Sequence, residues 1–257
     1  MNKKKYALLN GIGFVLMVIV NYLSNTGIFG GNTMKTVSDT YFTHFTPAGY
    51  AFSIWGIIYL GLLAFVLYTG LPLLSNRIAK PVIGKIGWLF CISCLANMLW
   101  IVSWLSHYTL LSVGLMVVLL LTLLVLVKRL ELNIVARKWK DYLFIALPFS
   151  LYTGWISVAI IANVASLLVK NGWEGFGLSA MQWTVMMIGV AGIVNLYMVL
   201  RRNMRAFGVV GIWALLAIAA NQNSNGSTII YACYAMSGIL SIAILFNFFK
   251  SYKQKIS

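Results

Sequence analysis

Tryptophan, tyrosine and asparagine residues recur at helical spacing inside three apolar stretches of the sequence. In chain order these residues, with one alanine between them, are Trp55, Tyr59, Asn97, Trp100, Trp155, Ala159 and Asn163. Within each stretch they stand three or four residues apart, so they share one face of a helix. Aromatic walls with a few polar groups are typical of a site for a flat apolar ligand. The alternative is packing between helices, because an asparagine in lipid needs a hydrogen-bond partner.

Groups for acid–base, metal or nucleotide chemistry are scarce in this sequence. The four acidic residues all lie outside or at the edge of the apolar stretches, and they are Asp39, Glu131, Asp141 and Glu174. An ion-coupled pump usually carries an ionisable group inside the membrane, so this class is disfavoured. The two histidines, His44 and His107, have too few partners to predict a metal site. No phosphate loop or nucleophile elbow occurs either. We therefore assign no catalytic residue, no metal and no required cofactor.

The elements that position the aromatic and amide residues are predicted to be membrane-spanning helices. The chain has 257 residues, of which 61% are hydrophobic and 9% are charged. A soluble domain carries about a quarter charged residues, so lipid must solvate much of this surface. Eight stretches are long and apolar enough to cross a bilayer as helices. They cover about 6–29, 50–71, 81–105, 109–128, 142–169, 179–200, 206–221 and 227–249. The fold class predicted is an all-α, polytopic membrane bundle.

Basic residues alternate between the predicted loops as topology signals do. With the N-terminus inside, seventeen lysines and arginines fall in inner segments, and two, Lys35 and Lys170, fall outside. This bias predicts a multi-pass protein of the cytoplasmic membrane, with both termini in the cytoplasm and an uncleaved first span. The net charge of +15 comes in short clusters rather than one long basic face. We therefore expect the lipid bilayer as a partner and no nucleic acid.

The first outer segment, Gly30 to Gly49, is the longest connection between predicted spans and mixes aromatic with polar residues. Long loops in compact folds are often functional lids, although a disordered turn is the alternative. A rise of 1.5 Å per residue places Trp55, Asn97, Trp100 and Asn163 at one depth, roughly 7–12 Å below the outer boundary. Three helices would thus bring indole and amide groups together beneath this segment.

These stretches resemble the TspO/MBR family, the tryptophan-rich sensory and translocator proteins. Span two is similar to the family's aromatic W-x-x-x-Y signature through Pro47, Gly49, Tyr50, Phe52, Trp55 and Tyr59. Spans three and five resemble its L-N-x-x-W and W-x-x-x-A-x-x-x-N segments. The resemblance covers residues 1–170, a five-helix unit, and residues 171–257 would add three helices. Three details depart from the family pattern: the spacing from Tyr50 to Trp55, the position of Pro148, and Ser93 in place of glutamine. The chain therefore resembles a long, divergent member.

The resemblance implies a function as well as a fold. It implies a pocket beneath the first loop that binds porphyrin, haem or another flat lipophilic molecule. The residues carried over as its lining are Trp55, Tyr59, Asn97, Trp100, Trp155, Ala159 and Asn163. We expect a membrane receptor or sensor for such a hydrophobic small molecule. The alternatives are a facilitative transporter and an intramembrane enzyme acting on a porphyrin or lipid. The family suggests a homodimer, although no clean G-x-x-x-G motif supports one here.

One further pattern lies outside the resemblance. Span seven reads WALLAIAAN, in which Trp213, Ala217 and Asn221 repeat the spacing found in span five. The repeat predicts that the additional spans supply another wall of the pocket, through Trp213 and Asn221, or a second and weaker site. Chance recurrence in an alanine-rich apolar sequence is the alternative.

Overall fold

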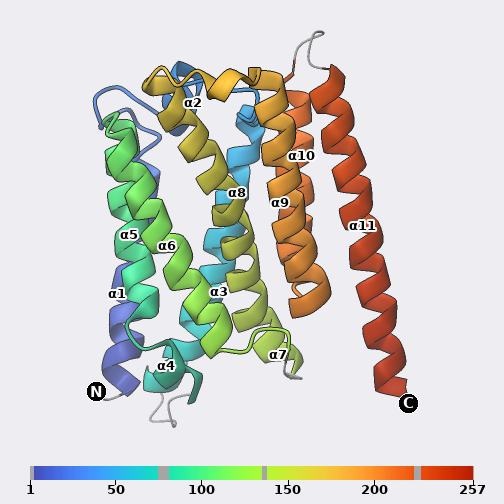
Figure 1. The fold of residues 1–257 in the computed structure, drawn as a ribbon. Coiled ribbons are helices and arrows are strands. Elements are labelled where there is room, and N and C mark those ends of the chain that lie inside the picture. The colour runs from blue at the N-terminus through green and yellow to red at the C-terminus, as the bar shows by residue number, and fades with distance from the viewer. Residues whose placement is uncertain (1–2, 75–80, 135–137, 223–226, 257) are drawn as a thin grey trace.

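The computed structural model describes residues 3–74, 81–134, 138–222 and 227–256, and within these ranges the chain is helical without strands (Figure 1). The helices are α1 (Lys3–Leu23), α2 (Met34–Thr40), α3 (Ile54–Leu74), α4 (Pro81–Ile86), α5 (Leu89–Leu105), α6 (Thr109–Arg129), α7 (Trp139–Asp141), α8 (Leu147–Lys170), α9 (Ala180–Arg202), α10 (Arg205–Ala220) and α11 (Ser227–Ile256). Short 3-10 turns cover Gly49–Ser53 and Gly175–Gly177, and a π-helical turn, Tyr142–Ala146, leads into α8. The predicted all-α membrane bundle is confirmed.

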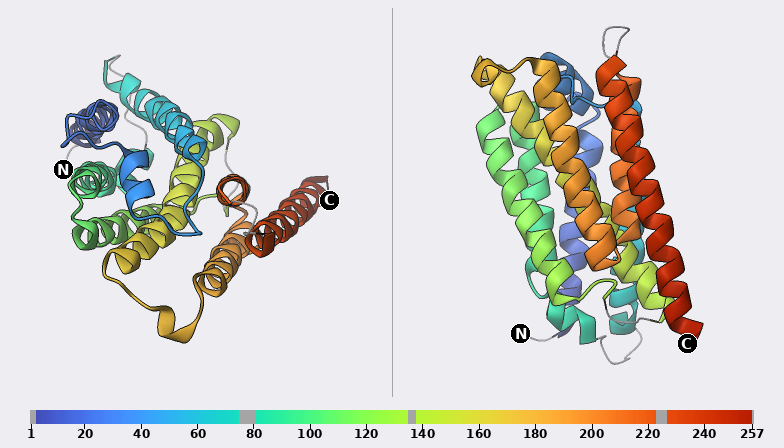
Figure 2. Two further views of the ribbon diagram at one scale, coloured as in Figure 1. Left: turned by 90° about the horizontal axis from the view of Figure 1, so that it is seen from above. Right: turned by 45° about the vertical axis from the view of Figure 1, so that its right-hand side comes forward.

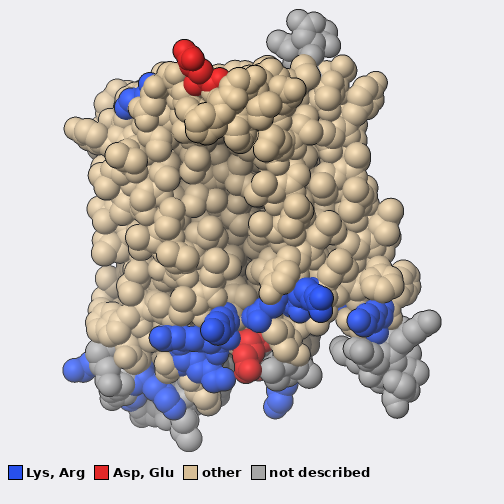
Figure 3. All heavy atoms as spheres, viewed as in Figure 1, with Lys and Arg blue, Asp and Glu red and all other residues tan. Residues whose placement is uncertain are grey.

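Six helical segments of the described chain are long and apolar enough to cross a membrane. The remaining two predicted spans correspond to shorter apolar helices, Leu89–Leu105 and Arg205–Ala220, which run alongside the others (Figure 1). Many large hydrophobic side chains are exposed along the helices. On the face seen in Figure 3, lysine and arginine gather at the end that carries both chain termini (Figures 1 and 3). We call this the basic end. Several residues counted in the charge argument, including Arg77, Lys80 and Arg137, lie outside the described residues.

Helix α8 is the centre of the bundle. It packs against α3, α6, α9 and α10, and it is the most buried of the long apolar helices. Helix α1 packs against α3 and α5 on one side, while α11 lies at the opposite edge against α9 and α10 (Figure 2). Residues on different faces of α8 can therefore contact different neighbouring helices.

Two predicted spans end or break earlier than apolar character alone indicates. Helix α1 ends at Leu23 because the side chains of Ser24 and Asn25 bind the backbone oxygen of Asn21, which competes with helical hydrogen bonds. The stretch 81–105, predicted as one span, is divided into α4 and α5 at Gly87. This glycine has φ +53°, a left-handed conformation that glycine adopts at low cost.

The 30–49 segment is folded over the end of the bundle opposite the basic end (Figure 2). It contains α2, which starts with a capping box in which Thr33 and Thr36 bond each other's backbone N–H groups. Met34, Val37 and Ser38 of α2 are buried. The segment therefore forms a structured cover, and the alternative of a disordered turn does not describe it.

Candidate functional site

A small cavity lies beneath the 30–49 segment, between helices α3, α5, α8 and α10. Its volume is about 60 Å³. The chain segments that line it come both from residues 1–170 and from residues 171–257. The lining residues are Ser38, Phe45, Thr46, Pro47, Phe52, Trp55, Trp100, Trp104, Met116, Trp155, Val158, Ala159, Ala162, Asn163, Ser166, Ala214 and Ile218. Water takes roughly 30 Å³ per molecule in the liquid, so the empty space is the size of about two waters. The site is too small for a larger molecule in this conformation.

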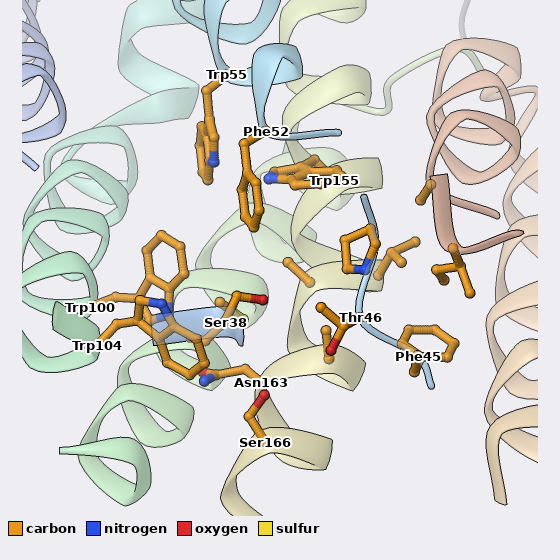
Figure 4. A pocket seen from close by; sticks show the side chains of 17 residues that line it. Ser38, Phe45, Thr46, Phe52, Trp55, Trp100, Trp104, Trp155, Asn163 and Ser166 are labelled. Atoms are coloured by element: carbon orange, nitrogen blue, oxygen red, sulfur yellow. The ribbon is translucent and has the colours of Figure 1, made fainter. Parts of the chain in front are cut away.

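Aromatic rings from three helices form one wall of the cavity (Figure 4). The ring of Trp55 on α3 lies 6.1 Å from Trp100 on α5 and 6.4 Å from Trp155 on α8, measured between centroids. Phe52, in the 3-10 turn before α3, meets Trp155 edge to face at 6.4 Å. Edge-to-face and tilted pairs of this kind stabilise packing by about 0.5–1.5 kcal/mol each beyond area burial. These rings could also stack on a flat ligand that enters between them.

The indole N–H groups of this wall have no acceptor among the described residues. The Nε1 atoms of Trp100, Trp104 and Trp155 are buried without a hydrogen-bond partner. A buried donor left unsatisfied costs about 1–3 kcal/mol. Natural structures keep such groups few, and each one calls for an explanation. All three residues line the cavity, so a ligand that carries hydrogen-bond acceptors could pair with these groups if it entered between the rings.

The polar end of the cavity is formed by α8. Asn163 donates a hydrogen bond from Nδ2 to the Ser112 hydroxyl of α6 at 3.0 Å. One turn further along, the Ser166 hydroxyl donates to the backbone oxygen of Tyr41 at 3.4 Å. Asn163 thus lines the cavity and also joins two helices through its hydrogen bond to Ser112.

Tyr59 and Asn97 are assigned to the pocket by the family resemblance, but they lie outside the cavity lining. Both bind Asn21 of α1, which donates to Asn97 Oδ1 at 2.8 Å and accepts from the Tyr59 hydroxyl. The Tyr59 ring also stacks on Trp55, with centroids 5.4 Å apart. These two residues hold Trp55 and α5 in place through their contacts with α1, outside the cavity lining. They support the aromatic wall and do not line the cavity in this conformation.

The structure brings Trp55, Trp100, Trp155, Ala159 and Asn163 together around the cavity. The residues that the sequence analysis missed include Trp104, Phe52 and Ser38, which also line it. Trp104 follows Trp100 by four residues, so the same helical spacing could have identified it. No comparable signal exists for Ser38, because its position depends on how α2 folds over the bundle.

Helix α10 contributes to the cavity, but with other residues than those predicted. Ala214 and Ile218 line it, whereas Trp213 and Asn221 do not. Trp213 instead donates from Nε1 to the Ala51 backbone oxygen at 3.3 Å. Asn221 donates from Nδ2 to the Thr46 backbone oxygen at 3.0 Å.

Two more hydrogen bonds join the segment over the cavity to the end of α10. Gln222 Nε2 donates to the His44 backbone oxygen at 2.9 Å, and the Ala48 amide donates to the Ala217 backbone oxygen at 2.9 Å. The end of α10 therefore holds the 44–51 backbone over the cavity. We call these four hydrogen bonds the α10 clamp.

Comparison with known families gives one match. A family model described as TSPO-like protein matches residues 7–246. The match includes the cavity, the 30–49 segment and α10, and it continues past residue 170 into the helices beyond. No curated protein and no solved structure matches the chain.

Proposed function

The chain belongs to the TSPO-like protein family, and from that premise we propose that it binds a flat hydrophobic ligand in the cavity beneath the 30–49 segment. The proposed role is that of a membrane receptor or sensor. A porphyrin or another tetrapyrrole fits this chemistry, because it presents a conjugated face to the aromatic wall and acceptor atoms at its edge.

The observation that carries this proposal is the set of unpaired indole N–H groups. Trp100, Trp104 and Trp155 offer donors at the cavity without acceptors of their own among the described residues. Carbonyl or carboxylate oxygens of a ligand would satisfy them and recover part of the cost of their burial. The lining carries no acid–base pair, which favours binding over catalysis.

The cavity must enlarge before it can hold such a ligand. Sites for small molecules usually have volumes of about 300–1,000 Å³, whereas this one has about 60 Å³. The movable wall is the 30–49 segment, because the other walls are membrane helices packed along their length. We infer that this segment lifts when the ligand enters and closes over it afterwards.

Tryptophan fluorescence tests the proposal. Titration with porphyrins and haem is expected to quench fluorescence saturably, and sterols, which lack a conjugated face, should quench little. Trp155→Phe removes one donor and part of the aromatic wall, so we expect the porphyrin Kd to rise by about tenfold, as a loss of 1–2 kcal/mol predicts. Trp139→Phe is the matched control, because Trp139 lies in α7 and is 70% exposed.

Absence of saturable quenching by every ligand in the panel would reject the tetrapyrrole proposal. Equal affinity of the Trp155→Phe variant and the wild type would place the ligand elsewhere. Ligand uptake into proteoliposomes would favour the transporter alternative, and consumption of the ligand would favour the enzyme alternative.

We also propose that the basic end faces the cytoplasm, in the cytoplasmic membrane. Lysine and arginine concentrate in cytoplasmic loops, and here they gather at the end with both termini. Green fluorescent protein fused after residue 257 should therefore fluoresce, and alkaline phosphatase fused there should be inactive. A phosphatase fusion after Gly172, at the opposite end, should be active. The reverse pattern would invert the topology.

A further inference from the structure

A groove much larger than the cavity lies between α8 and α9, near the end opposite the basic end. Its volume is about 600 Å³. One wall is the face of α8 that carries Ile160, Val164 and Leu168, and the other is the start of α9 with Trp183 and Met187. Seen from above, the connection between these helices bows outward across their ends (Figure 2). The groove is therefore apolar along its walls and covered at one end.

The connection between α8 and α9, which covers the groove, contains aromatic residues that are held in fixed positions. Trp183 donates from Nε1 to the Gly175 backbone oxygen at 2.6 Å. Its ring meets Trp173 with centroids 4.8 Å apart. Gly175 has φ +76°, and a Cβ at this position would lie 3.0 Å from Trp183 Nε1, so the close approach requires glycine. Tryptophans at this height are typical of the boundary between hydrocarbon and headgroups.

The rim of the groove carries a carboxylate for which the described part of the chain supplies no cationic partner. Glu174 lies in the cover, is exposed and lines the groove. The ion pair present among the described residues, Lys35 with Asp39, is elsewhere at this end. Lys170 donates to the backbone oxygen of His107. The negative charge of Glu174 is thus available to a positively charged group that arrives from the membrane surface.

The groove is separate from the cavity, although both use α8. Thr43 and His44 face the groove, whereas Phe45, Thr46 and Pro47 face the cavity. The 43–47 backbone is thus a partition between them, and the hydrogen bond from Gln222 to the His44 backbone oxygen helps to hold it in place. A molecule could occupy the groove without entering the cavity.

We propose that this groove binds one acyl chain of a phospholipid whose headgroup carries a primary amine, such as phosphatidylethanolamine. A group the size of water or methylene takes roughly 30 Å³, so the groove has room for about twenty such groups. This is about the number of carbon groups in one acyl chain. The walls from Ile160 to Leu168 extend about 12 Å along the helix, a depth within one leaflet. The ammonium group would pair with Glu174 at the rim, where the headgroups lie.

Native mass spectrometry of protein purified from bilayers of mixed phosphatidylethanolamine and phosphatidylglycerol tests this proposal. The wild type should retain phosphatidylethanolamine in preference to phosphatidylglycerol. Val164→Trp fills the groove from α8 and should lower retention by about tenfold. Met187→Trp fills it from α9 and serves if the first variant does not fold. Val118→Trp is the control, because Val118 is exposed on α6 to a similar extent, 46% against 37% for Val164.

The two parts of the proposal have separate outcomes. Glu174→Gln should keep a bound lipid but lose the preference for the amine headgroup. Retention by the filled variants equal to that of the Val118→Trp control would overturn the groove as a lipid site. A wild type that does not prefer phosphatidylethanolamine would overturn the assignment of the headgroup. Porphyrin quenching in the Val164→Trp protein should match the wild type, so failure of the lipid proposal is distinguishable from failure of the proposed function.

Discussion

Replacing Gly154 with leucine is expected to lower the stability of the bundle by about 3 kcal/mol. Gly154 lies on α8 where this helix approaches the backbone of α10. A Cβ at this position would lie 3.1 Å from both the Cα and the backbone oxygen of Phe207, and 3.2 Å from Cβ of Val210. Two of these atoms belong to the backbone, so the neighbour cannot move aside by a change of rotamer. The helices must separate, and Gly154→Ala should show a smaller effect of about 1 kcal/mol.

The separation should also reach the cavity, because Trp155 is the next residue and α10 carries both Ala214 and the α10 clamp. Thermal unfolding in detergent measures the stability, and porphyrin quenching measures the site. Gly114→Leu is the matched control, since Gly114 is on α6 with no atom near its missing side chain. Its stability should equal or exceed that of the wild type, because leucine favours helix over glycine. A Gly154→Leu protein as stable as the Gly114→Leu control would show that α8 and α10 do not pack this closely.

The membrane helices were predictable from the sequence because lipid allows few alternatives. An apolar stretch of about twenty residues can satisfy its backbone only as a helix. What hydropathy could not predict was where the helices break. The end of α1 depends on side-chain hydrogen bonds to the Asn21 backbone, and the break before α5 depends on the conformation of Gly87. Both are local effects of single residues, which an average over apolar character does not detect.

The aromatic wall was predictable for a related reason. Residues three or four apart share a helix face, and the depth argument placed Trp55 and Trp100 at one level. That argument did not separate Trp100, which lines the cavity, from Asn97, which turns toward Asn21. The difference depends on which helix packs on each side of α5. This information is in the tertiary arrangement and not in the spacing.

Weakening the α10 clamp is expected to release the 30–49 segment, which is the second large effect that we predict. In the double variant Trp213→Phe and Asn221→Ala, two hydrogen bonds to the backbone at Ala51 and Thr46 are lost. Each contributes about 0.5–1.5 kcal/mol, so closure should weaken by about 1–3 kcal/mol in total. Hydrogen exchange at the Ala48 amide is then expected to be about tenfold faster or more, because local opening becomes more frequent. If the segment covers a ligand, porphyrin dissociation should accelerate by a similar factor.

This experiment distinguishes control of ligand exchange by Trp213 and Asn221 from direct contact of these residues with the ligand. Trp213 and Asn221 do not touch the cavity, so their replacement should alter the rate of ligand exchange more than the contacts of the bound ligand. The control is the double variant Trp139→Phe and Asn171→Ala, which changes the same residue types at exposed positions. Exchange at Ala48 equal to that of the control would show that the clamp does not hold the segment closed. Faster exchange at Ala48 with unchanged porphyrin dissociation would show that opening of the segment does not limit the release of the ligand.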